Sequence, residues 1–443
     1  MSEAGGPPDE ELLDRFQRAA FGYLVEEFNP ANGLVADSSR QRAPCSIAVV
    51  GFALSSYPVG VERGWMMRAE AAARTLKTLR FFRNSEQSEQ PHATGYRGFF
   101  YHFLDMETGK RIWDSELSLI DSTFLLAGAL TAGAYFDEGT PEESEIRWLA
   151  DALYRRVDWA WALGGQATVR QGWKPGSGYL HYGWGGYDEA TMLYVLGLAS
   201  PTHPLPANTF AAWTATYQWE NIYGIDVLYG GPLFVHQFSH AWIDFAGIQD
   251  AFMREKNCDY FKNSRRAVLI QRDYARRNPH DFVGYGADCW GLSAGDGPGR
   301  FIAGANGVGQ SFFSYAARGA PFGPDDGTIA PSATLASLPF APELVLPALR
   351  HLATRFPDVV GGGRLPSGFN STLSGSTGTP WISEGHFGLD QGIIVLMIEN
   401  YRSGLLWRLM RACPYICTGL LRAGFCGGWL AGRSDGAASY ASA

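Results

Sequence analysis

The sequence predicts an all-α protein, an (α/α)6 barrel in which inner and outer helices alternate. Apolar periodicity marks about twelve helical segments and no convincing strand pair. Charged amphipathic segments alternate with segments that are apolar on nearly every side, and short connections alternate with long ones. A helix that is apolar all round is buried all round, and short connections join antiparallel neighbours. The two alternations therefore describe six inner helices surrounded by six outer helices.

The amphipathic segments are the first, third, fifth, ninth and eleventh, and we assign them to the outer ring. In the fifth segment Ile146, Leu149 and Leu153 recur on one face, with charged residues on the others. The second, fourth, sixth and twelfth segments are apolar and rich in small residues, and the fourth carries a single charge, Asp121. In chain order, we expect helices at 9–27, 44–57, 62–82, 115–136, 142–163, 188–199, 207–219, 239–253, 259–277, 330–339, 342–355 and 388–409, followed by a short terminal helix at 415–424.

The long connections follow the odd-numbered segments and are rich in Gly and aromatic residues. The longest runs from Asn278 to Ile329, about fifty residues. If successive helices are antiparallel, all long connections lie on the face where the inner helices begin, so we expect the site there. No Pro/Ser-rich linker interrupts the chain, which indicates one catalytic domain over 9–430 with flexible ends at 1–8 and 431–443.

Composition limits the function. The chain has 443 residues, 46% hydrophobic and 18% charged, which is enough for a large core. The formal net charge of −8 argues against nucleic acid or an anionic membrane as partner. No apolar run spans a bilayer, and the N-terminus lacks signal-peptide features. We expect a cytoplasmic protein, or a periplasmic or secreted one if a targeting segment was removed, that is a monomer or a weak dimer.

Carboxylates gather where the predicted inner helices begin. They are Glu116 and Asp121 at the fourth segment, Glu189 at the sixth and Asp390 at the twelfth. Acidic residues favour helix starts for capping alone, and capping accounts well for Asp188. It accounts least for Asp121, because a carboxylate inside a buried helix needs a partner or a cavity.

Acids that converge on an aromatic-lined cavity match the needs of glycosidic cleavage. One protonated carboxyl group donates to the leaving oxygen, while a second carboxylate activates water or attacks the anomeric carbon. Aromatic faces and polar tips suit sugar rings and their hydroxyl groups. The residues that we expect to bind sugar are Trp113, Trp173, Trp184, Tyr187, His236, Gln237, His240, Trp290 and Asp296.

A metal site is not expected. His236 and His240 lie four residues apart, but the HQFSH segment lacks the glutamate of the HExxH zinc-protease motif. The six cysteines show no zinc-binding spacing and are expected to be buried free thiols. The sequence contains no DxDD motif, so isoprenoid chemistry is not indicated. We therefore predict no metal and no cofactor.

A set of longer motifs runs through nearly the whole chain, over about residues 10–425. They include Gly98–Asp105, Glu116–Asp121, Gly172–Pro175, Tyr187–Glu189, Ser200–Pro204, Gly231–His240, Asp259–Ser264, Asp326–Pro331 and Leu389–Gly392. These segments resemble the glycoamylase-like domain family, which includes the endo-β-1,2-glucanases of glycoside hydrolase family 144 and the cyclisation domain of cyclic β-1,2-glucan synthases.

The resemblance implies an (α/α)6 barrel that hydrolyses β-1,2-linked glucose polymers. By similarity, Glu189 would be the general acid, and the base would come from Asp390 or from Glu116 and Asp121. In retaining relatives the residue that matches Glu116 would be the nucleophile, so the stereochemical outcome stays open.

We expect endo action. The alternatives are a transglycosylase, an exo-acting sophorose-releasing hydrolase, and a non-catalytic β-glucan-binding protein. Two departures from the family pattern, Ala246 in place of Arg and Ser367 in place of Asp, imply a changed subsite.

Overall fold

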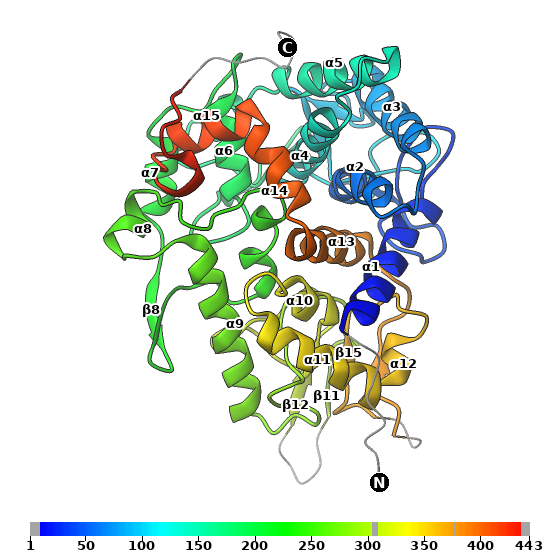
Figure 1. The fold of residues 1–443 in the computed structure, drawn as a ribbon, viewed down its shortest axis with the longest axis vertical. Coiled ribbons are helices and arrows are strands. Elements are labelled where there is room, and N and C mark those ends of the chain that lie inside the picture. Colours follow the sequence, from blue (N-terminus) through cyan, green and yellow to red (C-terminus); the bar gives the residue numbers. More distant parts are fainter. Residues whose placement is uncertain (1–8, 304–308, 375–377, 436–443) are drawn as a thin grey trace.

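The predicted ring of helices is present in the computed structural model of this chain, which describes residues 9–303, 309–374 and 378–435 (Figure 1). Of the two ends predicted to be flexible, 1–8 and 431–443, residues 1–8 and 436–443 lie outside these residues. The inner elements are α2 (Ile47–Glu62), α4 (Leu119–Tyr135), α6 (Thr191–Ala199), the 3₁₀ turns η2 (Leu233–His236) and η3 (Ser239–Ala241), α10 (Pro331–Ala336) and α13 (Gly388–Arg402).

Outer helices surround this ring. Most of them are amphipathic, and their buried residues face the inner helices. They are α1 (Asp9–Glu26), α3 (Arg68–Asn84), α5 (Pro141–Arg155), α7 (Thr209–Thr214), α9 (Tyr260–Arg277) and α11 (Pro342–Arg355), supplemented by α14 (Leu405–Ala412) and by α15 (Pro414–Arg422), which packs on α6. The fold is therefore the predicted (α/α)6 barrel.

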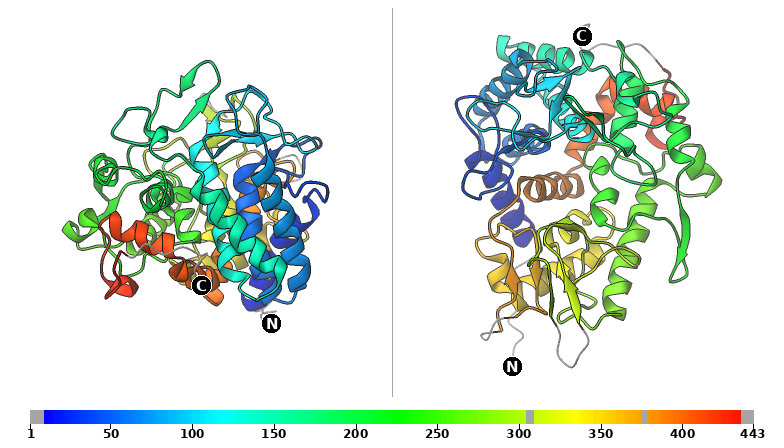
Figure 2. Two further views of the ribbon diagram at one scale, coloured as in Figure 1. Left: turned by 90° about the horizontal axis from the view of Figure 1, so that it is seen from above. Right: turned by 180° about the vertical axis from the view of Figure 1, so that it is seen from behind.

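The ring closes where the first helix of the chain meets the last inner helix. α1 packs on α13, and α13 also packs on α2 and α10. In Figure 1, α13 lies at the centre with α2 and α4 above it and α10 below, and the right view of Figure 2 shows the same arrangement from behind. A single apolar cluster extends from α1 to the C-terminal 3₁₀ turn η4 (Gly428–Leu430) and fills the space between the two layers.

Two glycines set the close approach of α2 and α4. A Cβ atom on Gly51 would lie 2.1 Å from the carbonyl oxygen of Phe124, and one on Gly128 would lie 2.1 Å from that of Gly51. The two inner helices therefore meet backbone to backbone, which no larger residue at either position permits.

The prediction of a helix over 239–253, the eighth in the chain, is wrong. This segment forms η3, then an extended stretch, then the short helix α8 (Ala251–Glu255). The side chain of Asp244 accepts the N–H of Ala246, and Gly247 has a φ of 75°, so the backbone turns away from a helical path. The helix predicted over 388–409 is also shorter than expected, since α13 ends at Arg402. Gly404 has a φ of 68° and separates α13 from α14.

The expectation of no strand pairs is also wrong. The long connections form small sheets whose strands hold two to four residues each, too few for an alternating pattern to be visible in the sequence. The largest sheet has the order β2-β3-β5-β6-β7, and its strands come from the connections that precede α4 and α6 in the chain. Its strands are β2 (Gly95–Tyr96), β3 (Phe99–Tyr101), β5 (Leu117–Ser118), β6 (Gly172–Lys174) and β7 (Gly178–Tyr179).

The remaining short elements lie in the same kind of connection. They are β1 (Cys45–Ser46), β4 (Phe103–Leu104), η1 (Trp161–Leu163), β8 (Trp219–Ile222), β9 (Ile225–Leu228), β10 (Ala294–Gly295), β11 (Phe301–Ala303), β12 (Gln310–Phe312), β13 (Ala316–Ala317), β14 (Thr328–Ile329), α12 (Pro357–Val360), β15 (Phe369–Asn370) and β16 (Trp381–Ile382).

Two smaller expectations can be checked in the same ranges. None of the six cysteines forms a disulfide, and five of them are buried as predicted, whereas Cys426 is exposed. Among the helices of the described residues, none combines the length and the apolar character that a membrane crossing requires.

Candidate active site

A cavity of about 590 Å³ opens at the N-terminal ends of the inner helices. Its walls come from the start of α4, the turn before α6, η2, the start of α10 and the start of α13. The strands that precede α4 and the loop around β10 also contribute to the lining. This is the face to which the two alternations in the sequence assigned the site.

The structure brings the four predicted catalytic carboxylates into this one cavity. Glu116 and Asp121 line it from the start of α4, Glu189 from the turn before α6, and Asp390 from the first turn of α13. Two of the predicted sugar-binding residues, Trp184 and Gln237, line it as well. The amide nitrogen of Gln237 donates to the carbonyl oxygen of Ala333 at 2.7 Å.

Three predicted sugar-binding residues lie outside the lining. Trp113 is 64% exposed on a loop, where its ring lies 5.3 Å from that of Phe103. Trp173 in β6 contacts other aromatic rings, and Asp296 forms an ion pair with Arg40. Arg40 also donates to the carbonyl oxygen of Glu384 at 2.9 Å.

Four more predicted sugar-binding residues, Tyr187, His236, His240 and Trp290, are buried behind the cavity wall. The ring nitrogen Nε2 of His236 lies 3.0 Å from the carbonyl oxygen of Gly230, and that of His240 lies 3.0 Å from the hydroxyl of Ser264. Burial lowers the pKa of His236 to about 4 and that of His240 to about 3, so both rings are neutral. Their partners in the structure are protein groups.

The two departures from the family pattern lie in different places. Ser367 lines the cavity and accepts the backbone N–H of Asp296 at 3.3 Å. Ala246 is exposed and is not part of the lining.

Three titratable residues that line the cavity were given no site role from the sequence: Asp37, His102 and Tyr315. Strand pairing explains why His102 lies in the cavity. β3 pairs with β5 in antiparallel register, Tyr101 opposite Leu117, and continuing this register sets His102 beside Glu116. Because each strand has only two or three residues, this register is not readable from the sequence.

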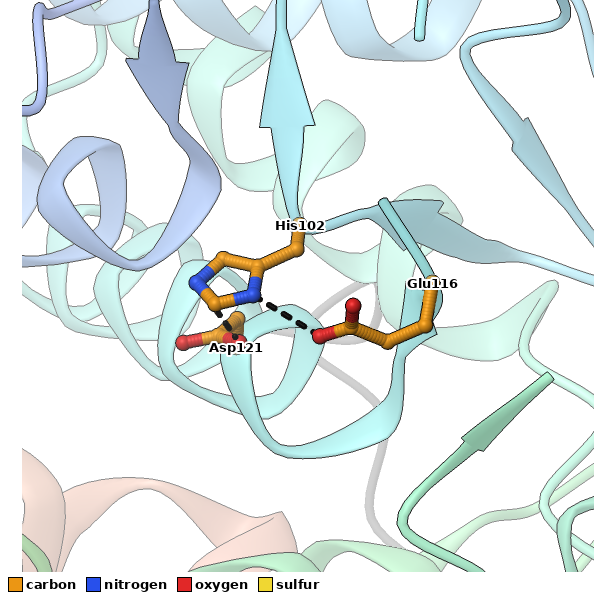
Figure 3. Close-up of side chains that lie close together, drawn as sticks. All are labelled: His102, Glu116 and Asp121. Carbon is orange, nitrogen blue, oxygen red and sulfur yellow. Dashed lines mark hydrogen bonds and ion pairs between the residues drawn. The ribbon is translucent and has the colours of Figure 1, made fainter. Parts of the chain in front are cut away.

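His102 lies between two of the carboxylates (Figure 3). Its Nδ1 atom is 2.8 Å from Oε1 of Glu116, and its Nε2 atom is 3.5 Å from Oδ2 of Asp121. Burial would lower the pKa of His102, but the charge of Asp121 and the hydrogen bond to Glu116 outweigh it and raise that pKa to about 9. Burial likewise opposes the charge on Glu116, yet the hydrogen bond and charge of His102 hold its pKa below the usual range.

The other carboxyl groups show the opposite shift. Burial, with a contribution from the charge of Asp121, raises the pKa of Glu189 to about 7. Burial also raises the pKa of Asp390 to about 7, although hydrogen bonds from Ser332 and Ser367 oppose the rise. Burial raises the pKa of Asp37 to about 6. The cavity therefore holds protonatable carboxyl groups together with charged ones, the condition for general acid catalysis near neutral pH.

One group of side chains has the donor set for a cation. The ligand atoms of His102, Glu116 and Asp121 lie within 4.8 Å of one another. One imidazole and two carboxylates suit a divalent metal. A metal would compete with the proton that the imidazole needs to pair with both carboxylates at once.

The fold and the cavity together define the class: an (α/α)6-barrel protein with a carboxylate-lined site at the starts of its inner helices. A family model named Glycoamylase and described as "Putative glucoamylase" matches residues 181–414. A solved structure of the same description from Bacteroides uniformis is 31% identical, covers 96% of this chain and 100% of its own, and superposes with a TM-score of 0.84. The chain belongs to the glycoamylase family.

Two further relatives have named activities. An endo-β-1,2-glucanase from Chitinophaga pinensis, solved with sophorotriose and glucose, is 27% identical, with 96% of this chain and 100% of that chain covered and a TM-score of 0.83. An exo β-1,2-glucooligosaccharide sophorohydrolase of Parabacteroides distasonis is 28% identical over 93% of this chain. The match spans 57% of that curated relative, little more than half its length.

Proposed function

We propose that this protein is a glycoside hydrolase that cleaves β-1,2-linked glucose chains, with Glu189 as the general acid. The observation that carries the proposal is that one cavity holds two carboxyl groups in opposite electrostatic environments. Glu189 is half-buried in the lining with a pKa of about 7, while Glu116 lies in the same lining with its pKa held low by His102. The substrate class is supported by the named activities of the two relatives.

In this mechanism the proton of Glu189 moves to the glycosidic oxygen as the bond from the anomeric carbon to that oxygen breaks. Positive charge develops on the sugar ring, and the carboxylates of Glu116 and Asp121 stabilise it across the cavity. If Asp390, Glu116 or Asp121 activates a water molecule, the product is inverted. If Glu116 attacks the anomeric carbon directly, a covalent intermediate forms and the configuration is retained.

The cutting mode that we propose is endo, as in the Chitinophaga relative. Exo release of sophorose is the second candidate, because the Parabacteroides relative carries that activity. Product profiling of linear β-1,2-glucan digests separates the modes: endo cleavage yields mixed oligosaccharides, exo cleavage yields sophorose alone, and transglycosylation yields rings or longer chains. A protein that only binds glucan would yield none of these.

The Glu189→Gln variant tests the proposal. We expect a loss of reducing-end release on the order of 10²- to 10⁴-fold, because the amide cannot donate the proton, while the fold is retained. Proton NMR of the same digest identifies the first anomer formed and so separates water activation from direct attack.

The matched control is Glu107→Gln, which makes the same change on an exposed loop and should leave activity unchanged. Near-normal activity of Glu189→Gln would remove Glu189 from the mechanism, and an inactive wild-type protein would refute the proposed substrate.

A further inference from the structure

We propose that His102 is a positioning residue, whose ring bridges Glu116 and Asp121 and holds both carboxyl groups in place on one wall of the cavity. Its catalytic consequence rests on the proposed function, whereas the charge state of the ring can be measured without it.

The backbone and the ring of His102 are both held in place. The N–H of His102 donates to the carbonyl oxygen of Glu116 at 2.9 Å, and its own carbonyl oxygen accepts the N–H of Ile47 at 3.2 Å. The ring stacks on that of Phe103, with centroids 4.0 Å apart and planes 12° apart. The imidazole is therefore a rigid spacer between the strand before α4 and the first turn of that helix.

Both ring nitrogens face carboxylate oxygens. A neutral imidazole has one donor nitrogen only, so it would present a lone pair to one of the two acceptors. The imidazolium has a donor at each nitrogen and satisfies Glu116 and Asp121 together. Figure 3 shows this arrangement, with the ring between the two carboxyl groups.

The surrounding charges favour the same state. Besides Glu116 and Asp121, the carboxylate of Asp37 acts on His102 and also raises its pKa. Lys174 acts on Glu116 from β6 and favours the charged carboxylate. Of the described residues that line the cavity, His102 is the only basic one.

Asp121 has a further partner that fixes its orientation. The hydroxyl of Ser118 donates to Oδ2 of Asp121 at 2.5 Å, and the backbone N–H of Asp121 donates to the same hydroxyl at 3.2 Å. This is an N-cap of α4, so Asp121 is anchored to the helix start while His102 sets its position relative to Glu116.

The bridge divides the acids of the cavity into two groups. The hydrogen bond and charge of His102 lower the pKa of Glu116, whereas Glu189 and Asp390 have no basic partner among the described residues and burial raises the pKa of each to about 7. His102 thus favours negative charge at Glu116, while burial favours the protonated forms of Glu189 and Asp390.

Two measurements test the proposal. The first is NMR titration of ¹³C-labelled histidine in the wild-type protein. We expect the His102 signal to titrate at about 9, far from the ordinary value of about 6.5. Titration at or below the ordinary value would overturn the proposal, whether or not the protein hydrolyses glucan.

The second measurement uses His102→Asn and His102→Gln. The Asn amide keeps a donor close to the Nδ1 position, toward Glu116, and the Gln amide keeps one close to the Nε2 position, toward Asp121, but neither carries a charge. We expect kcat to fall by more than about tenfold in both, with KM changed less than about threefold. We also expect the acidic limb of the pH profile to move to higher pH, because Glu116 loses the cation that lowers its pKa.

The control is His92→Gln, on an exposed loop, which should leave kcat and the pH profile unchanged. Full activity of either variant with an unshifted profile would overturn the positioning role. Activity that is abolished by a chelator and restored by a divalent metal would also overturn it, because a metal would then occupy the place of the proton. If a variant does not fold, the wild-type titration still decides.

Discussion

The carboxyl group of Glu189 lies in the cavity wall where burial favours its protonated form. The glutamate was identifiable from the sequence because it precedes an apolar inner helix. Its environment was not, since the neighbouring charge of Asp121 comes from another inner helix, α4. The same limit applies to His236 and His240, which we expected to bind sugar but whose rings contact Gly230 and Ser264.

A pH dependence of stability follows from Glu189. A carboxyl group whose pKa is raised from 4.5 to about 7 in the folded protein binds more protons folded than unfolded between these values. The ionisation of Glu189 therefore lowers the free energy of unfolding as pH rises from about 4.5 to 7.

We expect Glu189→Gln to raise the midpoint of thermal unfolding relative to the wild type at pH 8. The difference should vanish below about pH 4.5, where the native carboxyl group is protonated in both states. Scanning calorimetry at both pH values measures it. A stabilisation of equal size at both pH values would show that the effect comes from packing and not from ionisation.

At the scale of the elements, the inner helices were predictable because their apolar character is a local property of the chain. Their starts were predictable to within a few residues, and α4 and α13 carry the expected acids in or next to the first turn. The segment 239–253 was not predictable, because Asp244 and Gly247 end the helical path through backbone geometry. The sheet that contains β3, next to His102, was missed because its strands hold two or three residues.

The contact between α2 and α4 gives a prediction at this scale. We expect Gly128→Ala to lower the free energy of unfolding by about 1–3 kcal/mol, because its Cβ would lie 2.1 Å from the Gly51 carbonyl oxygen and force the two helices apart. The higher helix propensity of Ala, about 1 kcal/mol, opposes this loss only in part. Urea denaturation followed by circular dichroism measures the change.

The comparison variant is Gly139→Ala, where an added Cβ meets nothing within 4 Å. It should change stability by less than about 0.5 kcal/mol. If Gly128→Ala proved as stable as this control, the close backbone contact would not be a determinant of the ring.

At the scale of the whole molecule, the ring is closed by a buried carboxylate. Glu399 on α13 accepts a hydrogen bond from Gln17 on α1 at 3.0 Å and two from Arg63 at the end of α2, at 2.8 and 3.0 Å. Glu399 is 1% exposed. Three helices that are far apart in the sequence therefore depend on one side chain.

We expect Arg63→Ala to cost about 3–5 kcal/mol, because it leaves the charge of Glu399 buried without its cation. Arg350→Ala, which removes an exposed ion pair between α11 and Asp9 of α1, should cost at most about 1 kcal/mol. The shift of the first unfolding transition in urea distinguishes the two. Equal shifts would mean that the buried pair does not close the ring.

The sequence by itself determined the ring of helices and the gathering of Glu116, Asp121, Glu189 and Asp390 at its inner starts, because apolar periodicity and connection length are local properties of a chain. Only the tertiary structure decided which side chains face the cavity, which aromatic rings are buried behind it, and that His102 lies between Glu116 and Asp121. These facts depend on short strands and on packing partners far away in the sequence, whose contacts exist only once the ring has closed.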